Sequence, residues 1–292
     1  MTAPEGLLLV DKPSGITSHD AVDAVRRALG TRKVGHAGTL DPMATGLLLV
    51  GVGRATRLLR FLGELPKTYE GTARLGVETT TLDADGEVTA TEPVAVDDDD
   101  VRRAMVALVG DSLQRPPAYS AVKVGGRKLY EAARKGENLE APPRPIHVDA
   151  FDLIERRGDA LDFTVTCSSG TYVRALLADL GASLGCGAHL TRLRRTAIGP
   201  FRVEDAVPPD APGTPLPIEA VVRHLPRLDL DPEEAIAASR GRILAPAAID
   251  GPYAVFGPGG RLLGVYRDDG PKARPEVILA PAAPAGPLSS GS

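Results

Sequence analysis

Short apolar runs and alternating segments predict strands over the first two thirds of the chain. Residues 6–10 and 47–52 are continuous apolar runs of strand length, and residues 69–76 alternate apolar with polar positions. Residues 163–168 are also strand-like. All of these runs are far shorter than the segment that a membrane-spanning helix requires. We therefore expect them to be strands of a folded core.

Helical periodicity predicts three helices between these strands. The first has Thr17 or Ser18 as its N-cap and ends at Gly30. The second covers residues 98–109, where a leading run of aspartates suits the positive end of a helix. The third opens at residues 170–171. Its apolar positions recur at helical spacing and are Val173, Leu176, Leu177, Leu180 and Leu184.

The last third of the chain has a different pattern. Residues 208–217 are rich in proline, which is typical of a linker. Beyond them, two strand-like segments flank the turn at Gly257–Gly260 and predict a β-hairpin. We therefore expect a small β-rich C-terminal domain at about residues 225–282, followed by a disordered tail at 283–292.

The composition is that of an ordinary globular protein. Of 292 residues, 43% are hydrophobic and 25% are charged, enough for one large domain or two smaller ones with a real core. The first residues lack the basic start and apolar stretch of a signal peptide, so we expect a cytoplasmic protein. Two cysteines are too few for a disulfide framework or a zinc site, and the five histidines are not at ligand spacing. No metal is expected.

One short segment determines the sign of the net charge of −4. Residues 76–115 carry 3 basic and 10 acidic side chains, whereas residues 1–75 carry 10 basic and 7 acidic side chains. The rest of the chain is close to neutral. Because the acidic side chains are confined to one segment, the remainder can still present a basic face to nucleic acid.

Residues 116–146 differ from their surroundings. The segment is Pro-rich at both ends and carries six basic and three acidic side chains. Aromatic and cationic residues are interleaved in it, namely Tyr119, Lys123, Arg127, Lys128, Tyr130, Arg134 and Lys135. Such a segment can bind a phosphate backbone and stack on bases. An ordinary exposed helical hairpin would have the same composition, so the segment alone leaves both interpretations open.

The glycine-rich stretch at residues 35–46 holds one acidic side chain, Asp41, between a helix and an apolar strand. Its glycines allow tight turns, and Pro42 fixes the backbone after the carboxylate. A carboxylate held in this way, with no cluster of metal ligands nearby, suggests a nucleophile or a base. An Asp before a Pro is also a common N-cap. The stretch alone does not decide between the two.

Arg174 lies in the first turn of the third predicted helix. The helix dipole disfavours a cation at this end. A specific carboxylate or phosphate partner elsewhere in the fold would explain it, and a solvent-facing side chain is the other interpretation.

Six sequence blocks occur together in an order that is typical of one enzyme family. They are Val10–Ser18, Gly35–Gly46, Lys67–Tyr69, Pro117–Lys123, Cys167–Arg174 and Leu193–Arg195. In this order they resemble the motifs of the TruB family of bacterial tRNA pseudouridine synthases. The resemblance covers roughly residues 6–200.

This resemblance implies an isomerase that converts uridine 55 in the TΨC arm of tRNA to pseudouridine, without a metal or an organic cofactor. It implies an α+β pseudouridine synthase fold over residues 1–210, with a mixed, mostly antiparallel sheet and flanking helices. The segment at 116–146 matches the family's RNA-binding insertion. Residues 225–282 are similar, more loosely, to its PUA-like RNA-binding domain.

The resemblance also implies a role for individual residues. Asp41 lies at the position of the nucleophile, and Arg174 would pair with it and keep it ionised. Because the target base is stacked in a folded loop, it must be flipped out before the carboxylate can reach the sugar. Tyr69 would lie against the flipped base and is the family's candidate for a later proton transfer. Tyr172 would contact the bound nucleotide.

Three further positions complete the implied site. Leu193 would line the base pocket, His36 would contact RNA near the vacated stack, and Lys12 would support the active-site loop. Taken singly, a leucine or a tyrosine in such segments is usually a core residue, and a lone histidine is usually structural.

Two other functions remain open at this stage. The basic segment and the C-terminal domain also suit an RNA-binding or tRNA-folding module that acts without catalysis. A synthase that works inside a guide-RNA complex is another candidate, although the long basic tails expected of such a component are missing. No coiled-coil or apolar stripe argues for assembly, so we expect a monomer that needs no protein partner.

Overall fold

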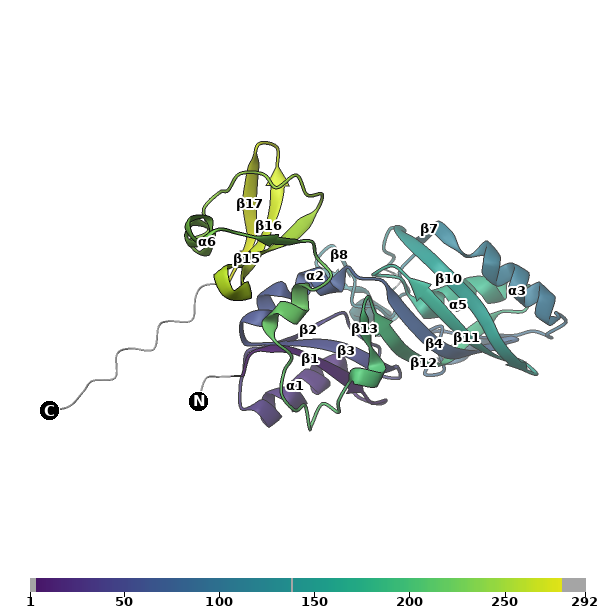
Figure 1. Ribbon diagram of the computed structural model, residues 1–292. Helices are drawn as coiled ribbons and strands as arrows, with labels where there is room; N and C mark the ends of the chain where they lie inside the picture. Colours follow the sequence, from purple (N-terminus) through teal and green to yellow (C-terminus); the bar gives the residue numbers. More distant parts are fainter. Residues whose placement is uncertain (1–3, 138, 280–292) are drawn as a thin grey trace.

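The computed structural model describes residues 4–137 and 139–279 (Figure 1). As far as residue 114 its elements are β1 (Gly6–Lys12), α1 (Ser18–Leu29), β2 (Val34–Ala37), β3 (Thr45–Val52), η1 (Gly53–Leu58), α2 (Leu59–Gly63), β4 (Lys67–Leu75), β5 (Val77–Thr79), β6 (Val88–Thr91), α3 (Asp98–Ala107) and β7 (Gly110–Gln114). They continue with β8 (Lys123–Val124), β9 (Arg127–Lys128), α4 (Leu129–Ala133), β10 (Arg144–Arg157), β11 (Ala160–Cys167), α5 (Val173–Ser183), β12 (Ala188–Ile198) and β13 (Phe201–Arg202). The last are η2 (Val203–Asp205), η3 (Ile218–Val222), β14 (Arg227–Asp229), α6 (Pro232–Ser239), β15 (Pro252–Gly257), η4 (Pro258–Gly260), β16 (Arg261–Asp269) and β17 (Lys272–Ile278). The expected disordered tail at 283–292 lies outside the described residues.

One large mixed sheet forms the centre of the molecule. Its strand order is β1-β3-β12-β4-β11-β10-β7, and β2 and β13 pair with β3 and β12. The described pairings within it are antiparallel except that of β12 with β3, which run parallel where Arg194 and Arg195 face Thr45 and Gly46. This is the mostly antiparallel mixed sheet that the family resemblance implied.

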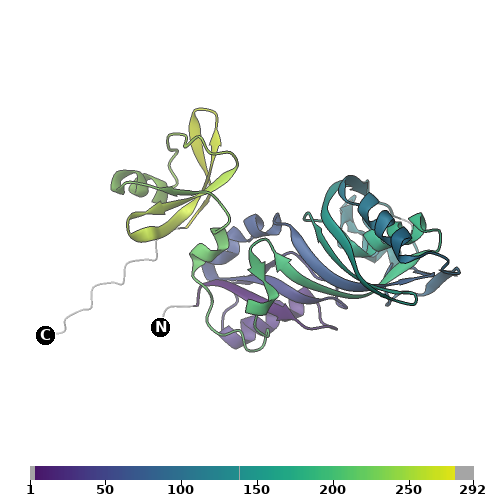
Figure 2. The same cartoon turned by 45° about the vertical axis from the view of Figure 1, so that its right-hand side comes forward.

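Helices cover the two ends of this sheet differently. At the end formed by β1 and β3, α1 packs on one face and η1, α2 and η3 pack on the other (Figures 1 and 2). At the end formed by β4, β11 and β10, α3 and α5 cover one face. Because side chains alternate along a strand, the opposite face of this end carries the polar positions of β4, which the burial of that strand confirms.

Capping residues set the starts of α1 and α3, and Thr17 is one of the two N-caps that the sequence predicts for α1. Thr17 and Asp20 form a capping box at α1, and Asp97 and Asp100 form another at α3. Helix α5 differs, since its N-cap residue, Tyr172, makes no side-chain capping bond. The start of α5 therefore depends on other contacts.

The proline-rich stretch at 208–217 is not a free linker. Leu7 and Leu216 exchange two backbone hydrogen bonds of 3.0 and 2.8 Å, and the N–H of Val207 donates to the carbonyl of Leu9 at 2.9 Å. The stretch thus covers the outer edge of β1, which is otherwise an unpaired strand edge. The predicted linker therefore connects the two domains and also satisfies a strand edge, because a proline-rich segment can pair at a few N–H groups without forming a full strand.

A four-stranded sheet of order β14-β15-β16-β17 follows (yellow in Figure 1), and β15 and β16 form the predicted hairpin. Helix α6 packs on one face of this sheet with Tyr253 and Tyr266. Side chains from its other face join the hydrophobic cluster of the first domain, and these include Ala254, Phe256, Leu262 and Val265. We propose about residues 225–282 as this domain, and the shared cluster attaches it to the larger one.

The segment at 116–146 forms a two-stranded hairpin, β8 and β9, followed by the short helix α4. It is not the helical hairpin that composition allowed. Leu129 and Ala132 of α4 are buried, whereas most cationic side chains of the segment at 116–146 are exposed. Within the described residues, no helix is long and apolar enough to span a membrane.

Candidate active site

A pocket of about 280 Å³ lies between the Asp41 loop, β4, β12, the start of α5 and the segment at 116–146. Five of the six site residues predicted from the sequence line it, and these are Asp41, Tyr69, Tyr172, Arg174 and Leu193. The fold thus brings together side chains from four separate sequence blocks. His36 is not among the residues that line the pocket.

Asp41 lies in a turn that the backbone of Ala44 closes, with a 3.1 Å hydrogen bond from the Ala44 N–H to the Asp41 carbonyl. No helix starts there, so the N-cap interpretation of Asp41 was wrong. The buried hydroxyl of Ser18 holds the preceding residue, since it accepts from the N–H of Leu40 at 2.9 Å and donates to its carbonyl at 3.2 Å. The loop is therefore fixed to the start of α1.

Lys12 supports the same loop through hydrogen bonds to backbone carbonyls. Its side chain is fully buried, and the ammonium donates to the carbonyls of Pro13, Ile16 and Pro42 at 2.9, 2.8 and 3.2 Å. Burial lowers the pKa of Lys12 to about 8, while the nearby Asp41 carboxylate acts in the opposite direction. The bond to Pro42 ties Lys12 directly to the residue after Asp41, which agrees with the supporting role that the resemblance implied.

Close contact between β3 and β12 places two pocket residues. Gly46 has a φ of +101°, and a Cβ at this position would lie 2.3 Å from the carbonyl oxygen of Arg195. Only glycine allows this approach. Arg195 is 1% exposed and donates to the carbonyls of Leu47 at 2.7 Å and Gly38 at 3.1 Å. It lies on the same face of β12 as Leu193 and lines the pocket with it.

Arg174 and Asp41 form an ion pair inside the pocket. The Nε atom of Arg174 lies 3.2 Å from Oδ2 of Asp41, and the side chains are 4% and 42% exposed. The remaining guanidinium nitrogens donate to the carbonyls of Thr81 at 3.0 Å and Tyr119 at 2.6 Å. This partner explains a cation in the first turn of α5, as the sequence suggested. The carboxylate stays half-exposed toward the pocket, so it can meet a ligand there.

Lys67 and Tyr69 occupy the pocket side of β4, two residues apart and therefore on the same face. Burial raises the pKa of the Tyr69 phenol, and the Arg195 guanidinium acts against this rise. Burial also lowers the pKa of Lys67 to about 8, and its ammonium donates to the carbonyls of Gly63 and Leu65 at 2.9 and 2.7 Å. Sequence reasoning did not single out Lys67 or Arg195 as site residues, although both belong to the quoted motifs.

His36 lies on β2, opposite Val50 of β3, rather than in a loop. Its ring packs edge-on against His19 with the centroids 5.5 Å apart. Burial, and then the neighbouring His19, lower the pKa of His36. The sequence also suggested that Gly35 makes a tight turn, but it is part of the same strand. A contact of His36 with RNA stays a prediction.

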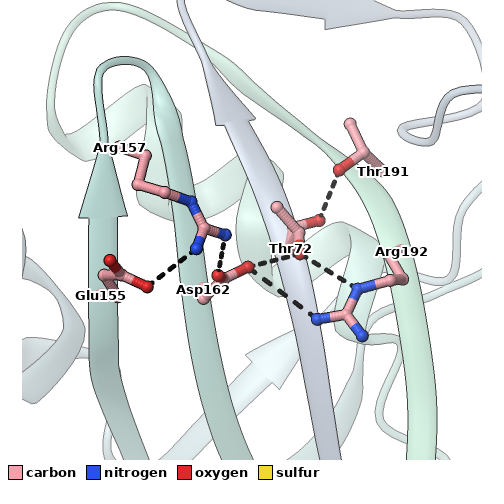
Figure 3. Close-up of polar contacts among 6 residues, drawn as sticks. All are labelled: Thr72, Glu155, Arg157, Asp162, Thr191 and Arg192. Carbon is pink, nitrogen blue, oxygen red and sulfur yellow. Dashed lines mark hydrogen bonds and ion pairs between the residues drawn. The ribbon is translucent and has the colours of Figure 1, made fainter.

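A second site with a carboxylate paired to arginine lies on the open polar face of the same sheet (Figure 3). Asp162 of β11 accepts a hydrogen bond from Thr72 Oγ1 at 2.5 Å and a very short one from Arg157, and Arg192 lies 3.9 Å away. Arg157 also pairs with Glu155 at 2.8 Å. We call Glu155, Arg157, Asp162, Thr72 and Arg192 the open-face network. Asp162 has cations or hydroxyls on both oxygens, unlike Asp41.

Across residues 4–137 and 139–279, no group of three or more His, Cys, Asp or Glu side chains is placed to hold a metal ion. A carboxylate, a phenol and cations line the pocket.

Comparison with solved structures identifies the class. The chain is similar to a chain of a Cbf5-Nop10-Gar1 complex, with a TM-score of 0.73 and 25% identity over 94% of this chain and 84% of that one. A chain of an H/ACA RNP bound to a substrate RNA containing 2'-deoxyuridine has the same fold, with a TM-score of 0.72 and 23% identity over 94% and 85%. The fold is that of the pseudouridine synthases, isomerases that act on uridine in RNA.

Sequence comparison then gives the family. Residues 26–173 match the profile described as TruB family pseudouridylate synthase (N terminal domain). Residues 174–210 match that of the tRNA pseudouridylate synthase B C-terminal domain, and residues 225–280 match that of tRNA Pseudouridine synthase II, C terminal. The chain belongs to the TruB family.

Individual relatives extend the match over nearly the whole chain. A tRNA pseudouridine synthase B of Mycobacterium sp. (strain KMS) is 48% identical over 95% of this chain and 97% of its own. The protein of the same name from Corynebacterium aurimucosum is 47% identical over 97% and 99%. The resemblance seen in the motifs is thus confirmed.

Proposed function

We propose that this protein isomerises uridine 55 in the TΨC arm of tRNA to pseudouridine. The observation that carries the proposal is the Asp41–Arg174 pair, in which a half-exposed carboxylate faces a pocket and a buried guanidinium lies 3.2 Å behind it. Family membership and the names of the relatives at 44–48% identity support tRNA as the substrate. An RNA-folding module without catalysis would need no such carboxylate.

The reaction is balanced without any co-reactant. The target uridine flips into the pocket, where Asp41 either attacks C1′ or acts through a glycal-type intermediate. The C1′–N1 bond breaks and its electrons stay with the uracil, which rotates and forms a new bond from C5 to C1′. As this bond forms, the bond from Asp41 to C1′ breaks or, on the glycal route, C2′ takes back the proton that Asp41 removed. The hydrogen on C5 then leaves as a proton, and N1 takes up a proton. The product is an isomer of the substrate.

The other pocket residues have roles that follow from their positions. We assign Tyr69 to a position against the flipped base, where its phenol, which burial keeps protonated, serves in proton transfer. Leu193 would pack against the base, and Tyr172 would contact the nucleotide at the start of α5. His36, which lies outside the pocket, would contact RNA beside the vacated stack.

The remaining surfaces suit a large RNA substrate. We assign the segment at 116–146, with its exposed cations, to binding of the tRNA backbone, and the C-terminal domain to a further RNA contact. We also propose that the enzyme works on tRNA as a monomer, in the cytoplasm and without a protein partner. Size-exclusion chromatography with light scattering tests the monomer.

Incubation with an unmodified tRNA transcript, followed by chemical mapping of pseudouridine, tests the proposal. We expect one modified position, uridine 55, and none in a transcript that carries cytosine at that position. Tight binding of the transcript with no pseudouridine at any position would instead support the RNA-folding module.

A further inference from the structure

The start of α5 has no cap of its own, although it carries two pocket residues. Tyr172, the N-cap residue, makes no side-chain capping bond, and Arg174 follows in the first turn, where the helix dipole disfavours a cation. A helix start with these properties needs support from another part of the fold, because its exact position decides where both side chains point.

Gln114 supplies that support from β7. It is the last residue of the strand and is 4% exposed. Its Oε1 accepts the backbone N–H of Tyr172 at 2.8 Å, and its Nε2 donates to the Tyr172 carbonyl at 3.1 Å. The amide thus binds both peptide groups of one residue, as a neighbouring strand would, and fixes Tyr172 in its extended conformation.

The consequences reach the catalytic pair through Arg174. Only Val173 separates Arg174 from the clamped residue, and the Arg174 guanidinium must contact Asp41, the Thr81 carbonyl and the Tyr119 carbonyl at the same time. Tyr119 belongs to the segment at 116–146, which follows β7, so the end of β7 and the segment after it each contact the start of α5. A shift of about 1 Å in such an arrangement costs on the order of 100-fold in rate.

We infer that Gln114 is a positioning residue, which holds Tyr172 and Arg174 so that Arg174 meets Asp41 in the reactive arrangement. The inference rests on the proposed isomerase function for its kinetic consequence, whereas the clamp itself is a contact that can be measured without any reaction. Gln114 is not among the residues that line this pocket, and both hydrogen bonds described for its side chain go to the backbone of Tyr172.

Three variants of the full chain separate positioning from general stabilisation. Gln114→Met keeps the length of the side chain and removes both hydrogen bonds. Gln114→Glu keeps the acceptor and regains a donor only when it is protonated. Tyr266→Phe is the matched control, since it removes a buried hydroxyl that donates to Ala238 and Arg242 in the C-terminal domain.

We expect Gln114→Met to lower kcat on the tRNA transcript by about 10- to 100-fold and to change KM by less than about threefold. Tyr266→Phe should leave kcat within about twofold at a comparable loss of Tm. The activity of Gln114→Glu, taken relative to the wild type at each pH, should rise as the pH falls from 8 to 5.5, because the protonated carboxyl can again donate to the Tyr172 carbonyl. Equal kcat values for Gln114→Met and Tyr266→Phe, or a relative activity of Gln114→Glu that does not change with pH, would overturn the inference.

Hydrogen exchange provides the readout that does not depend on activity. In Gln114→Met the amide of Tyr172 should exchange at least about tenfold faster than in the wild type, while the amides of α6 stay unchanged. Unchanged exchange at Tyr172 would show that the clamp is wrong, whatever the kinetics. If the wild type makes no pseudouridine but the amide of Tyr172 is protected only in the presence of Gln114, the proposed function fails and the clamp stands.

Discussion

Two carboxylates on opposite faces of the same sheet have opposite surroundings. Asp162, in the open-face network, accepts a hydrogen bond from Thr72 on one oxygen and from Arg157 on the other. Its side chain is 18% exposed. Asp41, in the pocket, pairs with Arg174 at 3.2 Å and is 42% exposed. We propose that the carboxylate with more partners is the structural one and that the carboxylate with fewer is the reactive one.

The difference indicates that the number of acceptor positions left unoccupied on a carboxylate, rather than its proximity to an arginine, distinguishes a functional acid. Exposed ion pairs on a sheet contribute little to stability and are common. Arg174 is different because it is buried and ordered by two carbonyls, so its charge is in place before any ligand arrives. The two carbonyls offset the desolvation of the buried guanidinium. We propose that Asp41, which is half-exposed, therefore keeps lone pairs available for the reaction.

The largest effect is expected from replacing the two carboxylates in turn. Asp41→Asn should lower turnover on tRNA by more than about 10³-fold, because the amide is a poor nucleophile, while tRNA affinity stays within about tenfold. Asp162→Asn should leave turnover within about twofold and cost about 1 kcal/mol of stability at most. Single-turnover mapping, filter binding and urea titration measure the three quantities. Full activity in Asp41→Asn would remove Asp41 from the mechanism.

The two arginines give the next contrast. Arg174→Ala should reduce turnover by about 100- to 1000-fold and tRNA binding by less than about tenfold, because it removes a preorganised charge beside the reacting centre. Arg157→Ala, on the open face, should change neither by more than about twofold. Steady-state kinetics and binding on both variants test this. A loss confined to binding in Arg174→Ala would mean that the guanidinium holds RNA rather than Asp41.

The pocket side of this contrast could be predicted from the sequence, whereas the open-face network could not. The motif order gave Asp41, Tyr69, Tyr172, Arg174 and Leu193, all of which the structure brings to one pocket. A cation at the disfavoured end of a helix was the physical signal, because it suggested a specific partner elsewhere in the fold, although a solvent-facing side chain was the other interpretation.

Other features were beyond local patterns. Strand β2 has only four residues, and its pairing with β3 decides that His36 lies on a strand. Arg195 enters the pocket only because β3 and β12 run parallel and touch at Gly46. Gln114 accepts a hydrogen bond from Tyr172, which lies 58 positions later in the chain. Such contacts depend on which strands become neighbours, and no short window of sequence contains that information.

A smaller effect should separate the cations of the insertion from those of the open face. Each lysine or arginine that neutralises a phosphate adds about 0.7 to 0.9 to the slope of log K against log salt. The double variant Lys123→Gln with Lys135→Gln should therefore lower the slope by about 1.5. The matched double variant Arg157→Gln with Arg192→Gln removes the same charge and should leave the slope unchanged. Binding titrations from 50 to 300 mM salt measure the two slopes. A slope that changes only in the second variant would show that the RNA binds the open face instead of the insertion.

The smallest expected effect concerns the buried lysine on the floor of the pocket. Burial lowers the pKa of Lys67 to about 8, below the 10.5 of an ordinary lysine. Between these values the unfolded chain binds a proton that the folded chain does not, so this residue makes the free energy of unfolding rise with pH. From pH 8 to pH 9 the wild type should gain about 1 kcal/mol relative to Lys67→Met, since only the wild type has this group.

Urea unfolding at pH 7, 8, 8.5 and 9 measures the rise, and Arg157→Met is the control from the open face. An arginine stays charged throughout this range, so its removal should leave the pH dependence parallel to that of the wild type. Any contribution of Cys167, whose pKa burial raises to about 11, is present in all three proteins and largely cancels in the differences. Parallel curves for the wild type and Lys67→Met would show that Lys67 keeps its charge in the fold. The floor of the pocket would then hold a permanent cation beside Tyr69, and the pocket would differ from the open face in geometry and burial but not in the titration of this lysine.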